Sequence, residues 1–185
     1  MAKIQVKNRS TACVVYTIPA LGDRVNICRE FAPKEIKTID EAELEALMFV
    51  PGGSVLLEEY LQVLDTDTKA VMNIGKEPEY DMSENDIKEL MTLGSLDAFL
   101  DCLDFAPEGV IDLIKKFAVD LPLNDTEKRA AILKKTGFDV DKAVVMKREA
   151  MDAAAETTEG KTRRVPVADT GRRTTAPNYK VVTKE

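Results

Sequence analysis

Hydrophobic residues between Ser83 and Met151 recur at the three- and four-residue spacing of amphipathic helices. Each repeat is bounded by residues that favour helix ends, namely Ser83, Gly94, Ser95, Pro107, Asn124, Asp125, Gly137 and Asp139. Serine and aspartate accept hydrogen bonds from the free N–H groups of a first turn, and glycine adopts the left-handed conformation that closes a last turn. The pattern predicts a compact bundle of about five short helices.

Alternating polar and apolar positions predict β-strands in the first forty residues. The alternation is clear at 3–7 and 25–31, residues 12–18 are rich in β-forming residues, and a further short strand is expected at 35–39. We expect the first two strands to pair with each other, because Asn8-Arg9-Ser10 between them is a turn sequence. Three or four antiparallel strands would make a small sheet or half-barrel.

The segment between the strands and the helical block predicts one or two further helices. Asp40 can cap a helix through Met48, and residues 55–64 favour helix over strand. The fold class is therefore α+β. We divide the chain into a β-rich unit over 1–78, a helical domain over 79–151 and a flexible basic C-terminal arm over 152–185.

Charge is distributed unevenly along the chain. The net charge is −7, but residues 161–185 contain seven Lys or Arg against Asp169 and Glu185. That segment therefore carries +5 and the preceding 160 residues carry −12. The tail has no periodic pattern of apolar residues whose burial could offset the entropy lost on ordering. We therefore expect a disordered or extended arm.

The arm contains the residues that we predict to bind a partner. They are Arg163, Arg164, Arg172, Arg173, Tyr179, Lys180, Val181 and Val182. In one interpretation the last four add a strand to a partner's sheet edge while the arginines bind carboxylates. The other interpretations are electrostatic attraction to nucleic acid and a solvated tail without a partner. We favour the first, because a purely electrostatic tail has no need of β-prone residues at its end.

The residue types that most enzymes and zinc sites require are scarce. The chain has no histidine, which removes the commonest general base and zinc ligand. Cys13, Cys28 and Cys102 lie far apart, so they predict reduced core or sheet residues and not disulfides. No nucleophile–base pair can be assembled. The sequence predicts no enzyme, catalytic residue, metal, cofactor or small-molecule substrate.

Neither a membrane segment nor a signal peptide is predicted. No run of about 18 apolar residues occurs, and the first residues alternate where a signal peptide needs an unbroken apolar stretch. We expect the protein to be made and kept in a cytoplasm.

Asp97, Asp101 and Asp104 fall on one face of the helix predicted after Ser95. Three carboxylates could bind calcium or magnesium, but sites for these ions usually include backbone carbonyls from a loop. We favour a solvated acidic stripe, which could dock arginines from a neighbouring copy's tail.

Residues 130–144 look somewhat like the helix-turn-helix of transcription regulators, with Gly137 at the turn. The helix after the turn begins with Asp139 and Asp141, which repel DNA phosphates, so ordinary helix packing is the favoured interpretation. The alternative function is a small regulator that binds nucleic acid through the helices of 124–150 and the basic tail.

The layout as a whole resembles the small accessory virion proteins of tailed bacteriophages. The similarity lies in the alternating β unit, the capped helical block and the Arg-, Thr- and Pro-containing tail that ends Tyr179-Lys180-Val181-Val182. It implies a structural protein in many copies on the capsid or at the head–tail junction, assembled in the host cytoplasm and located in the virion. Its partners would be other virion structural proteins, copies of itself included.

Overall fold

The computed structural model describes residues 3–19, 25–121 and 123–160, with side chains up to Ala154 in the last helix. Residues 1–146 form one compact unit and residues 147–185 a second. The eight partner-binding residues predicted in the tail lie outside the described residues. The domain boundaries expected after residues 78 and 151 stay predictions.

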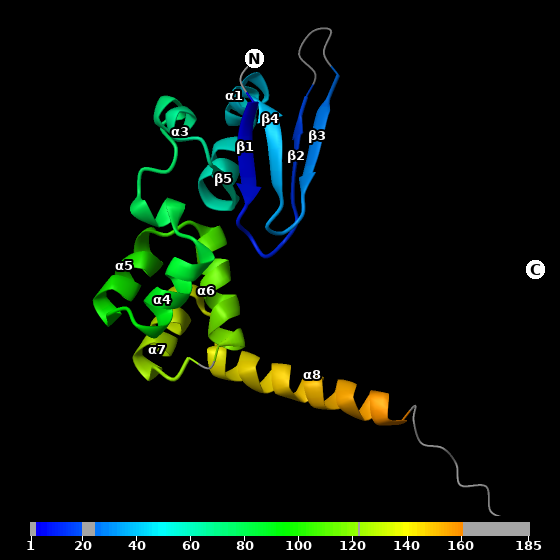
Figure 1. Cartoon of the computed structure of the whole chain (residues 1–185), viewed down its shortest axis with the longest axis vertical. Helices are drawn as coiled ribbons and strands as arrows, with labels where there is room; N and C mark the ends of the chain where they lie inside the picture. The colour runs from blue at the N-terminus through cyan, green and yellow to red at the C-terminus, as the bar shows by residue number, and fades with distance from the viewer. Residues whose placement is uncertain (1–2, 20–24, 122, 161–185) are drawn as a thin grey trace, which may run out of the picture. The chain divides into compact units, whose positions relative to one another are not determined.

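Five antiparallel strands lie in the N-terminal part (Figure 1). One sheet contains three strands in the order β4 (Ile36–Asp40), β1 (Lys3–Asn8) and β5 (Leu61–Val63). β2 (Val14–Ile18) and β3 (Ile27–Phe31) pair separately as a two-stranded sheet.

The expected pairing of the first two strands is wrong, because β1 pairs with β4 and β5. The residues after β1 do not form a tight hairpin turn. Asn8, Arg9 and Ser10 are all buried, and the side chains of Asn8 and Arg9 bind distant parts of the chain. These long-range contacts direct the chain away from β1 before β2 begins.

Short helical segments surround the sheets. They are α1 (Glu41–Phe49), α2 (Gly53–Val55), a π-helical turn (Leu56–Tyr60), α3 (Thr66–Met72) and a 3₁₀ turn (Pro78–Asp81). The helix predicted over 55–64 therefore ends at Tyr60, and the chain continues as β5. Residues from both sheets and from α1 share one hydrophobic core, which includes Val6, Phe31, Leu44, Leu47, Leu57 and Leu61.

Five helices follow, in the part of the chain where the hydrophobic pattern predicts them. They are α4 (Glu84–Thr92), α5 (Leu96–Phe105), α6 (Glu108–Asp120), α7 (Thr126–Thr136) and α8 (Val140–Gly160). Ser83 and Asp86 form a capping box, and Ser95 and Asp125 accept first-turn N–H groups as predicted. α6 supplies most of a second core, with Val110, Ile111, Leu113, Ile114, Phe117 and Ala118 buried. The α+β class is confirmed.

The last helix is longer than predicted. We expected it to end near Met151 and the flexible arm to begin at Asp152, but α8 has 21 residues and ends at Gly160. Three consecutive alanines follow Asp152, and alanine has the strongest intrinsic preference for helix. The loss of hydrophobic periodicity therefore did not mark the end of the helix.

Candidate functional site

Asn8, at the end of β1, is fully buried and joins β1 to the β2–β3 sheet. Its amide nitrogen lies 2.9 Å from the carbonyl oxygen of Ala12 and 3.0 Å from those of Phe31 and Ala32. Its side-chain oxygen accepts a hydrogen bond from the N–H of Ser10 at 2.9 Å. A short polar side chain thus connects the end of β1 to carbonyl groups before β2 and at the end of β3.

Arg9 is a buried arginine, only 5% exposed. Its guanidinium carbon lies 3.9 Å from the centroid of the Tyr80 ring, and Nη1 donates to the Tyr80 carbonyl at 2.9 Å. Nη2 lies 3.4 Å from the carbonyl oxygen of Leu61, and Nε has no hydrogen-bond partner among the described residues. Burial lowers the pKa of Arg9 below its usual value. The cation is held by the face of an aromatic ring and by carbonyl groups.

Tyr80 is fixed on both sides and at its hydroxyl. The hydroxyl accepts from the N–H of Val63 and donates to the carbonyl of Leu57, both at 3.0 Å. A Cβ atom on Gly75, whose φ is +66°, would lie 2.5 Å from the Tyr80 ring, so the backbone approaches the ring as only glycine allows. Burial is the main reason that the pKa of Tyr80 is raised.

Three contacts connect this cluster and its surroundings to the helical block. A Cβ atom on Gly109, in the first turn of α6, would lie 2.4 Å from Cγ of Arg9. The Glu59 carboxylate accepts the N–H of Glu108 at 2.7 Å, which caps α6. Lys34 pairs with Glu84 at 2.6 Å. The two hydrophobic cores of residues 1–146 are therefore linked by polar contacts.

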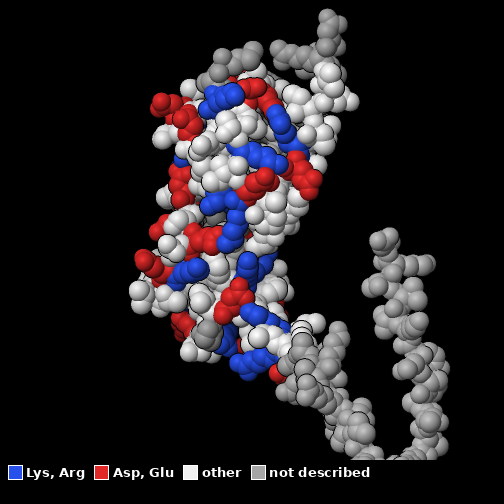
Figure 2. Space-filling view, turned by 45° about the vertical axis from the view of Figure 1, so that its right-hand side comes forward, with Lys and Arg blue, Asp and Glu red and all other residues white. Residues whose placement is uncertain are grey.

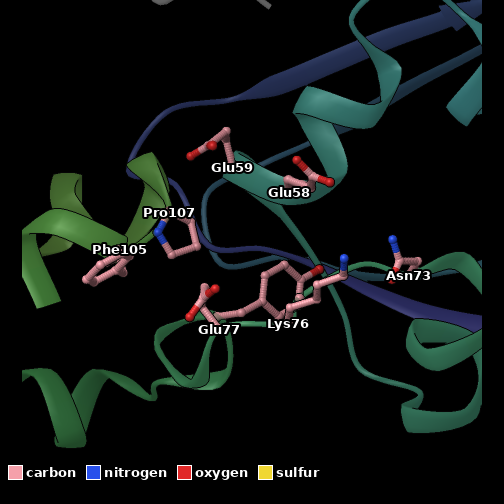
Figure 3. A pocket seen from close by; sticks show the side chains of 10 residues that line it. Glu58, Glu59, Asn73, Lys76, Glu77, Phe105 and Pro107 are labelled. Carbon is pink, nitrogen blue, oxygen red and sulfur yellow. The ribbon is translucent and has the colours of Figure 1, made fainter. Parts of the chain in front are cut away.

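Tyr80 is also one of the residues that line a cavity of about 290 Å³, which Figure 3 shows from close by. It is lined by Glu58, Glu59, Asn73, Gly75, Lys76, Glu77, Tyr80, Phe105, Ala106 and Pro107. Figure 3 shows Glu58 and Glu59 on one side of the cavity, with Glu77 and Lys76 on the other and Phe105 and Pro107 at one end. We refer to this cavity as the Tyr80 pocket. It combines three carboxylates, one ammonium group and aromatic surface.

The sequence pattern did not reveal the pocket. Its members come from the π-helical turn, the segment before Tyr80 and the end of α5, which no local spacing relates. The signal available was the run of acidic and aromatic residues at Glu58-Glu59-Tyr60, which we interpreted as a helix surface.

Two further charged side chains, those of Glu43 and Lys128, are buried and connect elements of the fold. Glu43 on α1 accepts two hydrogen bonds from Arg29, at 2.8 and 2.9 Å, and one from the Tyr16 hydroxyl at 2.8 Å. Arg29 lowers the pKa of Glu43, although burial opposes the shift. This network fastens α1 to both strands of the β2–β3 sheet.

Lys128 on α7 is only 3% exposed. Its ammonium group lies 3.2, 3.1 and 2.7 Å from the carbonyl oxygens of Leu90, Met91 and Gly94, at the C-terminal end of α4. A cation is favoured there by the helix dipole and by the carbonyls that lack helical partners. Lys128 is thus unavailable to a nucleic acid.

Three other basic residues near the predicted helix-turn-helix contact acids. Arg129 pairs with Asp141 at 2.7 Å, Lys142 with Asp139 at 3.0 Å and Lys135 with Asp104 of the acidic stripe at 2.7 Å. On the face shown in Figure 2, positive and negative side chains are intermixed. Those pairs partly neutralise the positive charge that the nucleic-acid hypothesis requires of this region, while Lys134 and Arg148 remain exposed.

The remaining candidate chemistry is limited among the described residues. The acidic stripe of Asp97, Asp101 and Asp104 lines a shallow hollow on α5. No group of three or more Cys, Asp or Glu side chains in the described ranges is placed to hold a metal ion. Cys102 is buried in the core, which raises its pKa to about 11, while Cys28 in β3 and Cys13 are exposed.

No helix in the described part of the chain is long and apolar enough to cross a membrane. Comparison of the chain with family models, with curated proteins and with solved structures gives no significant match.

Proposed function

We propose that this protein is a non-enzymatic assembly protein that binds neighbouring proteins through its C-terminal arm. The observation that carries the proposal is the separation of charge along the chain, with +5 on residues 161–185 and −12 on the preceding residues. Oppositely charged segments favour association between copies or with other acidic proteins. The β-prone end of the arm, from Tyr179 to Val182, adds a means of strand addition to a sheet edge.

The roles of the buried polar residues support an assembly protein over an enzyme. Asn8, Arg9, Glu43 and Lys128 each bind backbone or side chains of this chain and hold its elements together. Enzymes instead tend to place perturbed titratable groups where a substrate can reach them. The setting that we propose is a phage particle, with the protein on the capsid or at the head–tail junction.

The alternative of a nucleic-acid-binding regulator has less support. Of the basic residues in 124–150, Lys128 is buried, and Arg129, Lys135 and Lys142 contact carboxylates. Nucleic-acid binding would therefore depend on the tail together with the remaining basic residues of 124–150, of which Lys134 and Arg148 are exposed.

Substitutions in the arm test the proposal. In extracts of the native source, Tyr179→Ala combined with Val181→Asp is expected to abolish binding to the partner, because the strand would lose its apolar contacts. Arg172→Ala is expected to weaken binding modestly. Equal losses from every arginine substitution, with the Tyr179 and Val181 pair without effect, would contradict strand addition and favour a purely electrostatic tail.

A further inference from the structure

The volume of the Tyr80 pocket suits a single long side chain. Its volume of about 290 Å³ lies at the lower limit of the range typical of ligand sites, about 300–1,000 Å³. Phe105 is 57% exposed at one end of it, which is unusual for a phenylalanine and leaves aromatic surface without a cover. A nucleotide or a large cofactor would not be enclosed.

The charges of the pocket favour a cation. Glu59 already caps α6, but the side chains of Glu58 and Glu77 have neither a hydrogen bond nor an ion pair with the described residues. Figure 3 shows these two glutamates on opposite sides of the cavity. The lining residues carry one ammonium group, that of Lys76, and three carboxylates. A bound cation would therefore relieve repulsion between like charges.

The lining residues favour a guanidinium over an ammonium group. A guanidinium is planar, donates hydrogen bonds from several edges and stacks on aromatic rings. The lining offers it the exposed ring of Phe105 and the carboxylates of Glu58 and Glu77. The chain already uses the same chemistry internally, where Arg9 stacks on Tyr80.

We propose that the Tyr80 pocket binds an arginine side chain from residues 161–185 of a second copy of this chain. That segment holds Arg163, Arg164, Arg172 and Arg173 and has the opposite charge to the rest of the chain. Fully extended it spans about 80 Å, which is long enough to reach a neighbouring copy. The inference rests on the proposed function, since it names one partner of the anchoring arm.

Sedimentation velocity of the full chain over a range of concentrations tests the contact. We expect the wild type to associate as concentration rises. Glu58→Lys with Glu77→Lys is expected to weaken that association about tenfold or more, because the pocket would repel the arginine. Glu45→Lys with Glu89→Lys is the matched control, because it changes the net charge equally at two exposed glutamates outside the pocket. If the lysine pair fails to fold, Glu58→Gln with Glu77→Gln replaces it.

A charge exchange tests whether the arm and the pocket meet between copies. A chain with all four tail arginines changed to glutamate should not associate alone. Mixed with the Glu58→Lys, Glu77→Lys chain, it should associate again, because each acidic arm then meets a basic pocket. Restored association in the mixture, at a concentration where neither chain associates alone, is the expected result.

Several results would overturn the inference. They are a wild type that stays monomeric at every concentration, a pocket variant that associates like the wild type, a control that weakens equally, and a mixture that does not associate. None of these would contradict the anchoring function itself. That function fails if Tyr179→Ala with Val181→Asp leaves partner binding in extracts unchanged.

Discussion

The guanidinium of Arg9 lies 3.9 Å from the centre of the Tyr80 ring, and both residues are buried. Tyr80 is 71 positions later in the chain and lines the pocket that we assign to a partner arginine. The buried Arg9 also packs against α6 through Gly109. The contact therefore connects the first strand, the pocket and the helical block.

Loss of the Arg9 side chain should destabilise the protein. Arg9→Ala removes the ring contact and one of the two donors to the Tyr80 carbonyl, so we expect the free energy of unfolding to fall by about 2–4 kcal/mol. Urea unfolding followed by circular dichroism measures the change. Lys3→Ala, at an exposed position of the same strand, should cost less than about 0.5 kcal/mol. Similar losses for the two variants would refute the role given to Arg9.

The close approach of Gly109 to Arg9 should be visible as coupling between two substitutions. Gly109→Ala places a Cβ atom 2.4 Å from Cγ of Arg9 and is expected to cost about 1–3 kcal/mol. In the Arg9→Ala background the same substitution should cost less, because the side-chain overlap is gone. A double-mutant cycle in urea measures this, and strict additivity would show that the two residues do not contact.

Lys128 should stabilise the end of α4. Lys128→Met keeps the length of the side chain and removes the donor to three carbonyl groups, so the free energy of unfolding should fall by about 2–3 kcal/mol. Lys134→Met is the control, since Lys134 is exposed on the same helix. Thermal unfolding measures the stability of both variants. An equal loss of stability in the two would mean that Lys128 does not cap α4.

Glu43 should make stability depend on pH. Its pKa in the folded protein is lowered, mainly by Arg29, so its contribution is complete above the unfolded pKa of about 4.3 and disappears as the pH falls through the lower folded value. The stability difference between wild type and Glu43→Gln should therefore be constant from about pH 6 to 8 and shrink below about pH 4. Urea titrations at several pH values measure it.

Glu45→Gln, at an exposed position of the same helix, is the control and should show a small difference at every pH. A Glu43→Gln difference that grows on acidification would contradict the ionic network.

The helices of the second half were predictable because their signals are local. Ser83, Ser95 and Asp125 accept hydrogen bonds from N–H groups two or three residues ahead, and Gly137 has a positive φ of 71°. These interactions depend on neighbours in the sequence. A capping pattern therefore identifies them without knowledge of the tertiary structure.

The strand pairing and the candidate site were not predictable for the opposite reason. Asn8 looks like an ordinary turn residue, yet its side chain is held by carbonyl groups more than twenty positions away. Lys128 and Glu43 resemble the exposed charges on the same helices. Only the tertiary structure separates them from Lys134 and Glu45, since burial depends on elements distant in the sequence.

The mass and nucleic-acid content of the protein purified from its native source test the anchoring arm most directly, measured with the full chain and with a chain that ends at Gly160. The account predicts a large protein assembly for the full chain and its loss on removal of residues 161–185. A monomer that carries nucleic acid only while those residues are present would contradict the account, and its binding would then fall steeply with salt.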